Sequence, residues 1–284
     1  MRICYLILVH QKFDQALRMV QRLNWGDPGF IFHIDSAVDS LVVAAFKAQL
    51  QGYKRVSYAR RVRSRWGGYP QALAIMHCVQ TAATQIEAFD RYVLLSGQDY
   101  PIADRANFEA LFAKNTNAEY IEAYPQDVMD DSVEGWSPYY RFRRYHVWIG
   151  NRHIKIPILR KGLPPLPIYH GSTWWALTHS AISYLAKEFD SNRALRRYLL
   201  TGFLVDEVYV PTLIMASPLA LNVVGENVTY AKWTPTSGPH PKTLRIDDLN
   251  ELLNSKKLFA RKFDATSDQA ILDTLDGLHR GNER

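Results

Sequence analysis

Two hydrophobic periods alternate along the first part of the chain. The continuous apolar run from Arg2 to Val9 is typical of a strand covered on both faces, as in a parallel sheet. From Phe13 to Leu23, apolar residues recur at three- and four-residue steps, which predicts an amphipathic helix. A strand at Gly29 to Asp35, a helix from about Ala37 to Gln51 and a short strand at Val56 to Tyr58 continue the pattern. Strands alternating with helices predict an α/β fold built on a parallel sheet.

The alternation continues to residue 123 and then breaks. We expect a helix over Gly68 to Glu87, a buried strand at Tyr92 to Leu95, a helix over Asn107 to Lys114 and a strand at Glu119 to Ala123. From Tyr124 to Pro167, aromatic and basic residues mix without a clear period. Long irregular segments inside a domain are usually functional or mobile. We therefore expect a lid or an acceptor-facing insertion here.

The last third of the chain predicts mainly helices, at His179 to Glu188, Arg193 to Leu200 and Asp206 to Ala216. No stretch resembles a linker, an internal repeat or a low-complexity tract. We therefore expect residues 1–284 to form a single domain.

Composition narrows the class of protein without naming a partner. A hydrophobic content of 47% with 12% aromatic residues excludes wholesale disorder. The net charge of +6 and the pI near 9.2 favour an anionic partner, but nucleic acid, an acidic membrane surface and nucleotide diphosphates all qualify. Cys4 and Cys78 lie in apolar surroundings, which favours buried thiols in a reducing cytosol. The run from Ile3 to Val9 is too short to span a bilayer and lacks a cleavage site, so no export signal is expected.

Polar residues where predicted strands end are the first candidates for ligand contacts. His33 and Asp35 stand at the end of the second strand, and ligands of open α/β sheets gather at the carboxyl ends of strands. The loop from Arg60 to Tyr69 then places four arginines, including Arg63, around Trp66 and a pair of glycines. This loop could be a solvated basic segment. It could equally approach an anion, with arginine supplying charge and glycine allowing close contact.

The stretch from Gly171 to Leu213 combines aromatic faces with a candidate base. Trp174 and Trp175 would point to opposite faces of a strand, so one belongs to the core and the other can stack on a sugar. Asp206 and Glu207 stand at the start of a helical pattern. A carboxylate there can simply complement the helix dipole, or it can act as a general base.

Several other chemistries lack their motifs. The sequence contains no His-x-x-x-His pair, no glycine-rich phosphate loop and no Gly-x-Ser-x-Gly nucleophile. Asp130-Asp131 is the nearest approach to an Asp-x-Asp metal motif, but it lies in the irregular segment without a preceding strand. A sugar transfer that inverts the anomeric centre needs one base and positive charge near the departing diphosphate. We therefore favour a metal-independent reaction without a cofactor.

Six sequence motifs, taken in their order along the chain, point to one known family. They are Phe32-His33-Ile34-Asp35, Trp66-Gly67-Gly68, Leu95-Ser96-Gly97-Gln98-Asp99-Tyr100-Pro101-Ile102, Gly171-Ser172-Thr173-Trp174-Trp175, Asp206-Glu207 and Leu258-Phe259-Ala260-Arg261-Lys262-Phe263-Asp264. With these motifs the chain resembles the core-2/I-branching β-1,6-N-acetylglucosaminyltransferases and the related peptide O-xylosyltransferases of glycosyltransferase family 14. The resemblance implies an inverting enzyme with a GT-A-like fold, a mixed and mostly parallel central sheet flanked by helices.

The resemblance also assigns roles to individual residues. It implies that Glu207 is the catalytic base. The residues implied to bind the donor, with a nucleotide-binding half at 1–123, are His33, Asp35, Arg63, Trp66, Lys242, Arg261 and Lys262. The residues implied to face the acceptor are Glu122, Trp175, Asp206 and Trp233. The insertion at 124–167 would face the acceptor, and the part at 168–284 would complete the acceptor and diphosphate sites.

The implied reaction moves a sugar, GlcNAc or xylose, from a UDP-sugar to a hydroxyl group of a glycan or glycoconjugate. The chain lacks the membrane anchor and the many cysteines of the animal enzymes, so we expect a cytoplasmic bacterial enzyme of polysaccharide biosynthesis, at most peripheral to the inner face of the membrane. Two alternatives stay open. A nucleic-acid-binding module is disfavoured by the absence of a basic helix face, and an inactive glycan-binding or anion-binding protein of the same fold by the presence of Glu207 and Lys262.

Overall fold

A computed structural model describes residues 1–85, 87–125, 141–142, 144–150, 152–162, 164–235 and 238–280. At its centre lies a five-stranded sheet in the order β10-β4-β1-β2-β3. Four strands run parallel: β1 (Ile3–Val9), β2 (Gly29–Ile34), β3 (Val56–Tyr58) and β4 (Arg91–Ser96). The short edge strand β10 (Ala176–Leu177) pairs with β4 in the antiparallel direction. The predicted mixed and mostly parallel sheet is confirmed.

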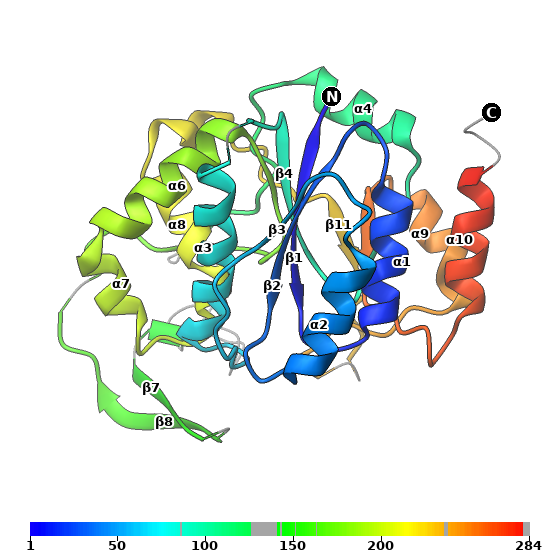
Figure 1. Ribbon diagram of the computed structural model, residues 1–284. Coiled ribbons are helices and arrows are strands. Elements are labelled where there is room, and N and C mark those ends of the chain that lie inside the picture. The colour runs from blue at the N-terminus through cyan, green and yellow to red at the C-terminus, as the bar shows by residue number, and fades with distance from the viewer. Residues whose placement is uncertain are drawn as a thin grey trace.

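Helices cover both faces of this sheet (Figure 1). On one side lie α1 (Phe13–Leu23) and α2 (Ser40–Gln49), and on the other α3 (Tyr69–Ala83) and α6 (His179–Ser191). Because successive strand residues point to opposite faces, Tyr5 and Ile7 pack with α1 and α2, whereas Cys4 and Leu6 pack with α3 and α6. This two-sided burial explains why β1 reads as an uninterrupted apolar run.

A second, three-stranded sheet joins the far ends of the chain. It consists of β11 (Thr229–Ala231), β12 (Phe259–Arg261) and β5 (Asp99–Pro101), with β12 in the middle. The short strand β5 follows β4 almost directly, so the second sheet begins where the first one ends. The C-terminal helices α9 (Leu249–Asn254) and α10 (Ala270–Arg280) lie beside it (Figure 1).

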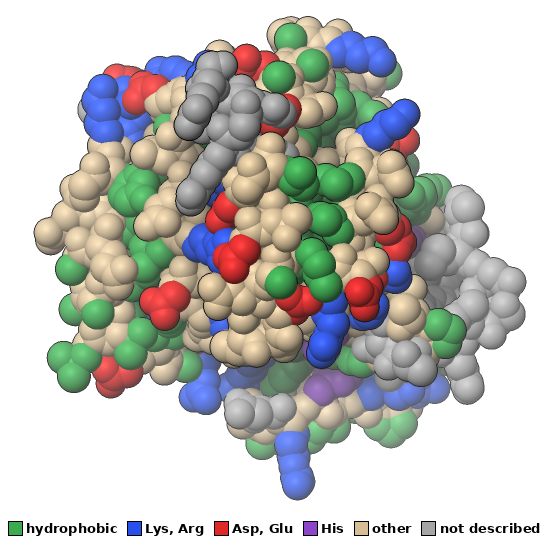
Figure 2. Space-filling view, turned by 90° about the vertical axis from the view of Figure 1, so that its right-hand side faces the viewer, with side chains coloured by type: hydrophobic (Ala, Val, Ile, Leu, Met, Phe, Trp, Pro, Cys, Tyr) green, Lys and Arg blue, Asp and Glu red, His purple; other side chains and the backbone are tan. Residues whose placement is uncertain are grey.

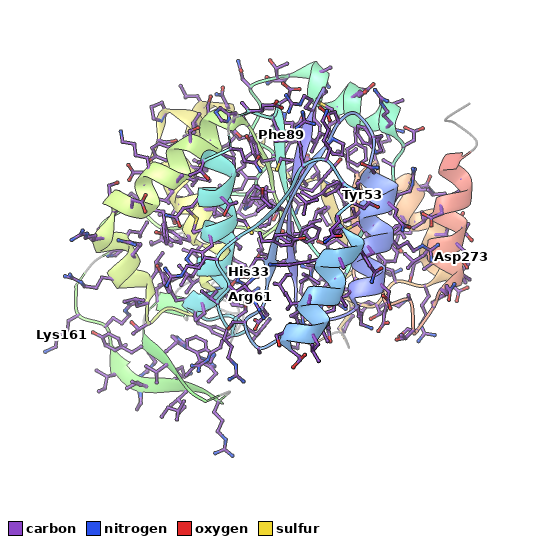
Figure 3. The ribbon with its side chains drawn as sticks, viewed as in Figure 1. His33, Tyr53, Arg61, Phe89, Lys161 and Asp273 are labelled. Atoms are coloured by element: carbon purple, nitrogen blue, oxygen red, sulfur yellow. The ribbon has the colours of Figure 1, made fainter. Side chains whose placement is uncertain are left out.

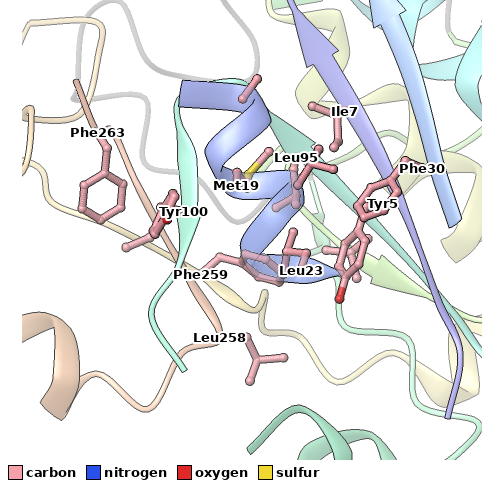
Figure 4. Packing of buried hydrophobic residues seen from close by; sticks show 14 of the residues in the cluster. Tyr5, Ile7, Met19, Leu23, Phe30, Leu95, Tyr100, Leu258, Phe259 and Phe263 are labelled. Carbon is pink, nitrogen blue, oxygen red and sulfur yellow. The ribbon is translucent and has the colours of Figure 1, made fainter. Parts of the chain in front are cut away.

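Aromatic and aliphatic residues together fill the core between the two sheets and α1 (Figure 4). The Tyr5 ring stacks on Phe30 with centroids 5.6 Å apart and meets Phe259 edge-on at 6.3 Å. The Tyr100 ring meets Phe263 edge-on at 6.0 Å. Such pairs add about 0.5–1.5 kcal/mol each beyond the burial of their surface. They hold the strand that carries Arg261 against the central sheet.

The remaining elements surround the sheets. They are α4 (Arg105–Lys114), β6 (Tyr124–Pro125), β7 (Arg144–Ile149), β8 (Arg152–Leu159), β9 (Tyr169–His170), α7 (Arg193–Leu199), α8 (Tyr209–Met215) and the 3-10 turns Val205–Glu207, Pro218–Asn222 and Ile246–Asp248. The hairpin of β7 and β8 projects from the body of the molecule (Figure 1). No helix among the described residues is long and apolar enough to cross a bilayer.

Two predicted elements are wrong. Residues 119–123 form no strand, because the Glu119 amide bonds to Asn222 and the Tyr120 amide to Ala176, two different neighbours. The single helix predicted from residue 206 to 216 is instead the 3-10 turn Val205–Glu207 followed by α8. A continuous helix would need an amide hydrogen at position 211, and Pro211 has none. The carbonyl of Glu207 accepts a hydrogen bond from the Gly171 amide instead, at 3.0 Å.

The predicted insertion, 124–167, is partly regular. Residues 144–149 and 152–159 form the β7–β8 hairpin, so the expectation of an irregular segment is wrong for them. Its strands read as irregular in sequence because aromatic and basic residues occupy both faces. Asp130-Asp131 lies outside the described residues.

The carboxyl ends of the strands meet at one edge of the sheet. His33 near the end of β2 and Arg61 after β3 lie at this edge, whereas Tyr53 and Phe89, which precede β3 and β4, lie toward the opposite edge (Figure 3). Three hydrogen bonds from the Arg61 guanidinium to the carbonyls of Ile34, Asp35 and Val38 tie the loop after β3 to the end of β2. The edge is thus a fixed platform for the loops that follow.

Candidate functional site

A cleft of about 1430 Å³ opens at this carboxyl edge. Its lining comes from residues that follow β1, β2 and β4, from the loop at 170–174, from the 3-10 turn at 205–207 and from β11 and β12. A smaller cavity of about 600 Å³ shares His10, Asp35, Ser64 and Trp66 with it. Pockets for one small ligand span roughly 300–1,000 Å³, so the two spaces together have room for two substrates.

Glu207 presents its carboxylate to this cleft. Its side chain is 28% exposed, and its Oε2 lies 2.8 Å from Nη1 of Arg141 in an ion pair. Burial raises the pKa of Glu207, Arg141 lowers it and Asp206 raises it, and the result is a pKa of about 7. A carboxylate with this pKa can accept a proton near neutral pH and is therefore suited to act as a general base.

Asp206 lies beside Glu207 but is almost fully buried. Its Oδ2 accepts hydrogen bonds from Thr173 Oγ1 at 3.0 Å and from Gln71 Nε2 at 3.1 Å. Its Oδ1 has no hydrogen-bond partner among the described residues, and Asp206 lines the cleft. Burial raises the pKa of this carboxyl group. Because Thr173 and Gln71 hold Oδ2, the group is oriented rather than free to rotate.

Arg261 supplies a fixed positive charge to the same cleft. Its Nε lies 3.1 Å from Oδ1 of the fully buried Asp99, and its guanidinium stacks 4.0 Å above the ring of Trp174. Asp99 is itself held by the Ser96 amide at 2.7 Å. Burial lowers the pKa of Arg261, and the carboxylates of Asp99, Asp206 and Glu207 raise it. Arg261 therefore interacts electrostatically with the candidate base.

Lys262 is the second cation of the cleft. It follows β12 directly and lines the cleft beside Arg261. Burial and the neighbouring Arg261 lower the pKa of its ammonium, and Asp99 raises it. No carboxylate of the described residues lies within ion-pair distance of Lys262. A partly desolvated ammonium without a close counter-ion favours the binding of an anion.

Glu122, just before β6, also lines the cleft. Its carboxylate accepts hydrogen bonds from the Ser172 amide at 3.1 Å and from Asn227 Nδ2 at 2.6 Å. Burial raises the pKa of Glu122. A Cβ at Gly171 would overlap the Glu122 carbonyl oxygen, so glycine at 171 allows the two segments to meet.

Besides Arg261 and Lys262, three predicted donor residues line the cleft or the smaller cavity beside it. The Asp35 carboxylate accepts hydrogen bonds from the amides of Ala37 at 2.8 Å and Ser64 at 2.7 Å, and it borders both spaces. Arg63 borders the smaller cavity, and Trp66 borders both. Asp35, at the end of β2, thus faces both spaces.

Two predicted donor residues lie elsewhere. His33 is fully buried and borders neither space, because its Nε2 accepts a hydrogen bond from the Val62 amide at 3.1 Å. Burial lowers the pKa of His33 to about 4, which keeps the imidazole neutral for this bond. Lys242 also lies outside the lining, since its Nζ is 3.0 Å from the Asp248 carboxylate. His33 thus positions the loop that carries Arg63, and Lys242 is an ion-pair residue.

Trp175 was predicted to face the acceptor, but Trp174 is the one of the two that lines the cleft. Trp175 is 1% exposed and packs in the core between the sheet and α6, so its predicted contact with an acceptor is wrong. Trp174 lines the cleft beneath Arg261. Trp233, the other predicted acceptor residue of this type, lines the cleft and is 57% exposed.

Sequence reasoning missed several residues of the cleft, notably His10, Arg141 and His170. His10 directly follows β1, and the rule that selected Asp35 would have selected it as well. Arg141 sits in a segment without a period, where nothing distinguishes it from its basic neighbours. His170 is buried, and its burial together with the nearby Arg141 lowers its pKa to about 4.

Comparison with known proteins identifies the family. The model of the family described as "Core-2/I-Branching enzyme" matches residues 3–255. The chain belongs to this family. Its mixed and mostly parallel sheet, with helices on both faces (Figure 1), is the architecture that the motifs implied.

Relatives within the family are distant in sequence. Xylosyltransferase 2 of Mus musculus is 23% identical over 97% of this chain, and that of Homo sapiens 24% over 97%. Xylosyltransferase 1 of Mus musculus is 22% identical over 99% of the chain. The chain spans about a third of the length of these relatives, 33%, 33% and 31% respectively. Among solved structures, residues 1–349 of S. aureus TarS match at a TM-score of 0.32 and 11% identity, covering 73% of this chain and 56% of that one.

Proposed function

We propose that the protein is an inverting, metal-independent glycosyltransferase that moves GlcNAc or xylose from a UDP-sugar to a hydroxyl group of a glycan or glycoconjugate. The observation that carries the proposal is the placement of one candidate base and two cations in the same cleft. Glu207 has a pKa raised to about 7, and Arg261 and Lys262 line the same space. Family membership supports the same reaction class.

In the proposed step, Glu207 takes the proton of the acceptor hydroxyl group. The resulting oxygen attacks the anomeric carbon from the face opposite the diphosphate, and the bond between that carbon and the diphosphate oxygen breaks. UDP leaves with the electron pair, and Arg261 and Lys262 offset its growing negative charge. Fixed charges act most strongly in such a site because they need no rearrangement during the reaction.

The proposal assigns the nucleoside to the smaller cavity, where Asp35, Arg63 and Trp66 lie. Asp35 can accept a hydrogen bond from a hydroxyl or imino group, and Trp66 offers an aromatic face. The acceptor would enter beside Glu122 and Trp233 on the other side of Glu207. Asp206 also lines the cleft and would lie beside the bound acceptor.

Metal independence belongs to the proposal as well. Within the ranges that the structure describes, no three His, Cys, Asp or Glu side chains are grouped so that they could hold a metal ion. The argument for independence is the positive one that Arg261 and Lys262 already supply charge to the cleft. Each would take on part of the role that a divalent ion plays for a departing diphosphate.

Release of UDP from a panel of sugar nucleotides tests the proposal. We expect release with UDP-xylose or UDP-GlcNAc that rises when a glycan acceptor is added and persists in excess chelator. The xylosyltransferases among the relatives make UDP-xylose the first donor to test. Activity that is lost in chelator and restored by manganese would contradict metal independence. A protein that binds these donors and acceptors but never turns them over would instead be a glycan-binding protein.

The pKa of Glu207 sets an expected pH dependence. A base must be unprotonated, so kcat/KM should rise as the pH increases through about 7 and level off above it. His170 has a pKa lowered to about 4 and stays neutral across this limb. Because Arg141 lowers the pKa of Glu207, Arg141→Gln should move the limb to higher pH, whereas Arg141→Lys keeps the cation and should leave it nearly in place. A limb that both variants leave unchanged would belong to another group.

A further inference from the structure

The β7–β8 hairpin has one face that is packed against the body. His146 and Trp148 of β7 and His153 of β8 share this face, because Trp148 pairs with His153 across the hairpin. The ring of His153 stacks on Phe203 with centroids 4.5 Å apart, and that of His146 does so at 5.3 Å. These contacts fix the orientation of the hairpin on the molecule.

The other face of the hairpin carries most of its aliphatic side chains, and several of them are exposed to solvent. By the register of the pairs, Tyr145, Val147 and Ile149 share it with Arg152, Ile154 and Ile156. Ile149 is 68% exposed, Ile154 39% and the nearby Ile158 60%. A two-stranded hairpin that exposes branched aliphatic side chains on its outer face is an unusual feature of a soluble surface, where contiguous apolar patches mark interaction sites.

Positive charge flanks this aliphatic face. Residues 135–187 contain no Asp or Glu, the exposed Arg152 lies on this face, and the exposed Lys161 follows the hairpin. Lys161 lies at the outer edge of the molecule (Figure 3). The far side of the protein differs, since acidic and basic side chains are interspersed over it (Figure 2). The excess charge of the chain is therefore concentrated around the hairpin.

We propose that the outer face of the β7–β8 hairpin docks on an anionic phospholipid bilayer. The exposed isoleucines would enter the interface between headgroups and acyl chains, and the basic side chains would pair with anionic headgroups. A second copy of the chain fits less well, because an isologous contact would bring two basic hairpins together. A soluble polyanion would use the charges but leave the isoleucines exposed.

The docked hairpin would also orient the cleft. Trp148 and His153 on the packed face of the hairpin line the smaller cavity. The hairpin therefore has this cavity on one face and the proposed membrane surface on the other. Membrane docking would thus place the cavity beside the bilayer. The proposal stands on the hairpin alone and does not depend on sugar transfer.

Cosedimentation with vesicles tests the docking surface. Wild-type protein should bind vesicles of phosphatidylcholine and phosphatidylglycerol in equal parts, and binding to phosphatidylcholine alone should be much weaker. Changing Arg152 and Lys161 to Ser should weaken binding about twenty-fivefold, at about fivefold for each charge near the surface. Ile149→Ser with Ile154→Ser and Ile158→Ser should weaken it at least about tenfold, because buried aliphatic surface is lost.

Leu221→Ser is the matched control. Leu221 is 93% exposed on the 3-10 turn Pro218–Asn222, and its replacement should leave vesicle binding unchanged. Thermal unfolding of each variant checks the fold. Equal binding to neutral vesicles, or full binding by the isoleucine variant, would overturn the proposal. A dimer in light scattering that the isoleucine variant abolishes, without vesicle binding, would assign the surface to a second copy.

Discussion

Glu207→Gln is expected to lower kcat about a thousandfold while leaving donor binding nearly unchanged. The substitution keeps the size of the side chain and removes its capacity to take a proton, and a positioned base contributes typically 10²- to 10⁴-fold. The carboxylate is 28% exposed and paired with Arg141, so the change leaves one buried guanidinium without its counter-ion. Turnover is measured by UDP release, and donor binding by calorimetry.

The control for this experiment is Glu226→Gln. Glu226 is exposed, lies outside the cleft lining and has a distant ion pair with Lys257 at 3.5 Å. Its replacement should leave kcat unchanged, and thermal unfolding should show both variants folded. Wild-type activity in Glu207→Gln would remove this carboxylate from the reaction. Loss of donor binding together with activity would indicate a role in binding instead.

Lys262→Met is expected to lower kcat/KM about a hundredfold to a thousandfold. Removing one group that stabilises developing negative charge has typically this effect on turnover. The methionine keeps most of the aliphatic stem, so the loss would come from the charge rather than from packing. Lys262 has no ion-pair partner among the described residues, which makes it a cleaner target than Arg261, whose removal would strand the buried Asp99.

Lys242→Met is the matched control for charge. Lys242 was predicted to bind the donor, but its ammonium lies 3.0 Å from Asp248 and outside the cleft lining. Its replacement should change kcat/KM little, whereas the Lys262 variant should lose activity and affinity for UDP together. If the two variants lose activity equally, the diphosphate site extends beyond the cleft described above.

The periods of the sequence were sufficient for the four parallel strands of the main sheet and for its helices, but not for the short edge strand β10. Strands β1, β2 and β4 are buried on both faces and so read as apolar runs, and α1 buries one stripe at helical spacing. These patterns follow from local geometry, because side chains alternate between faces along a strand and recur every three to four residues on one face of a helix. The short strand predicted at Glu119 failed because its residues bridge two different neighbours that the sequence does not place beside it.

Proximity along the chain was a poor guide to the cleft. The rule for strand ends found Asp35, but His33 two residues earlier is turned into the core, where it accepts a hydrogen bond from Val62. Trp174 and Trp175 are neighbours in sequence and both are buried, but only Trp174 reaches the lining of the cleft. Arg141 lies far from Glu207 in sequence and meets it only in the folded chain.

By itself, the sequence determined the α/β class, the approximate bounds of most strands and helices, and the family, because these follow from local periodicity and from motifs in a fixed order. Only the tertiary structure decided which side chains meet, Glu207 with Arg141 and Arg261 with Asp99 and Trp174, and that Ile149, Ile154 and Ile158 of the hairpin are exposed. The physical reason is that charge and burial depend on distances in space. A carboxylate gains a pKa near 7 from what surrounds it, and those surroundings come from segments distant along the chain.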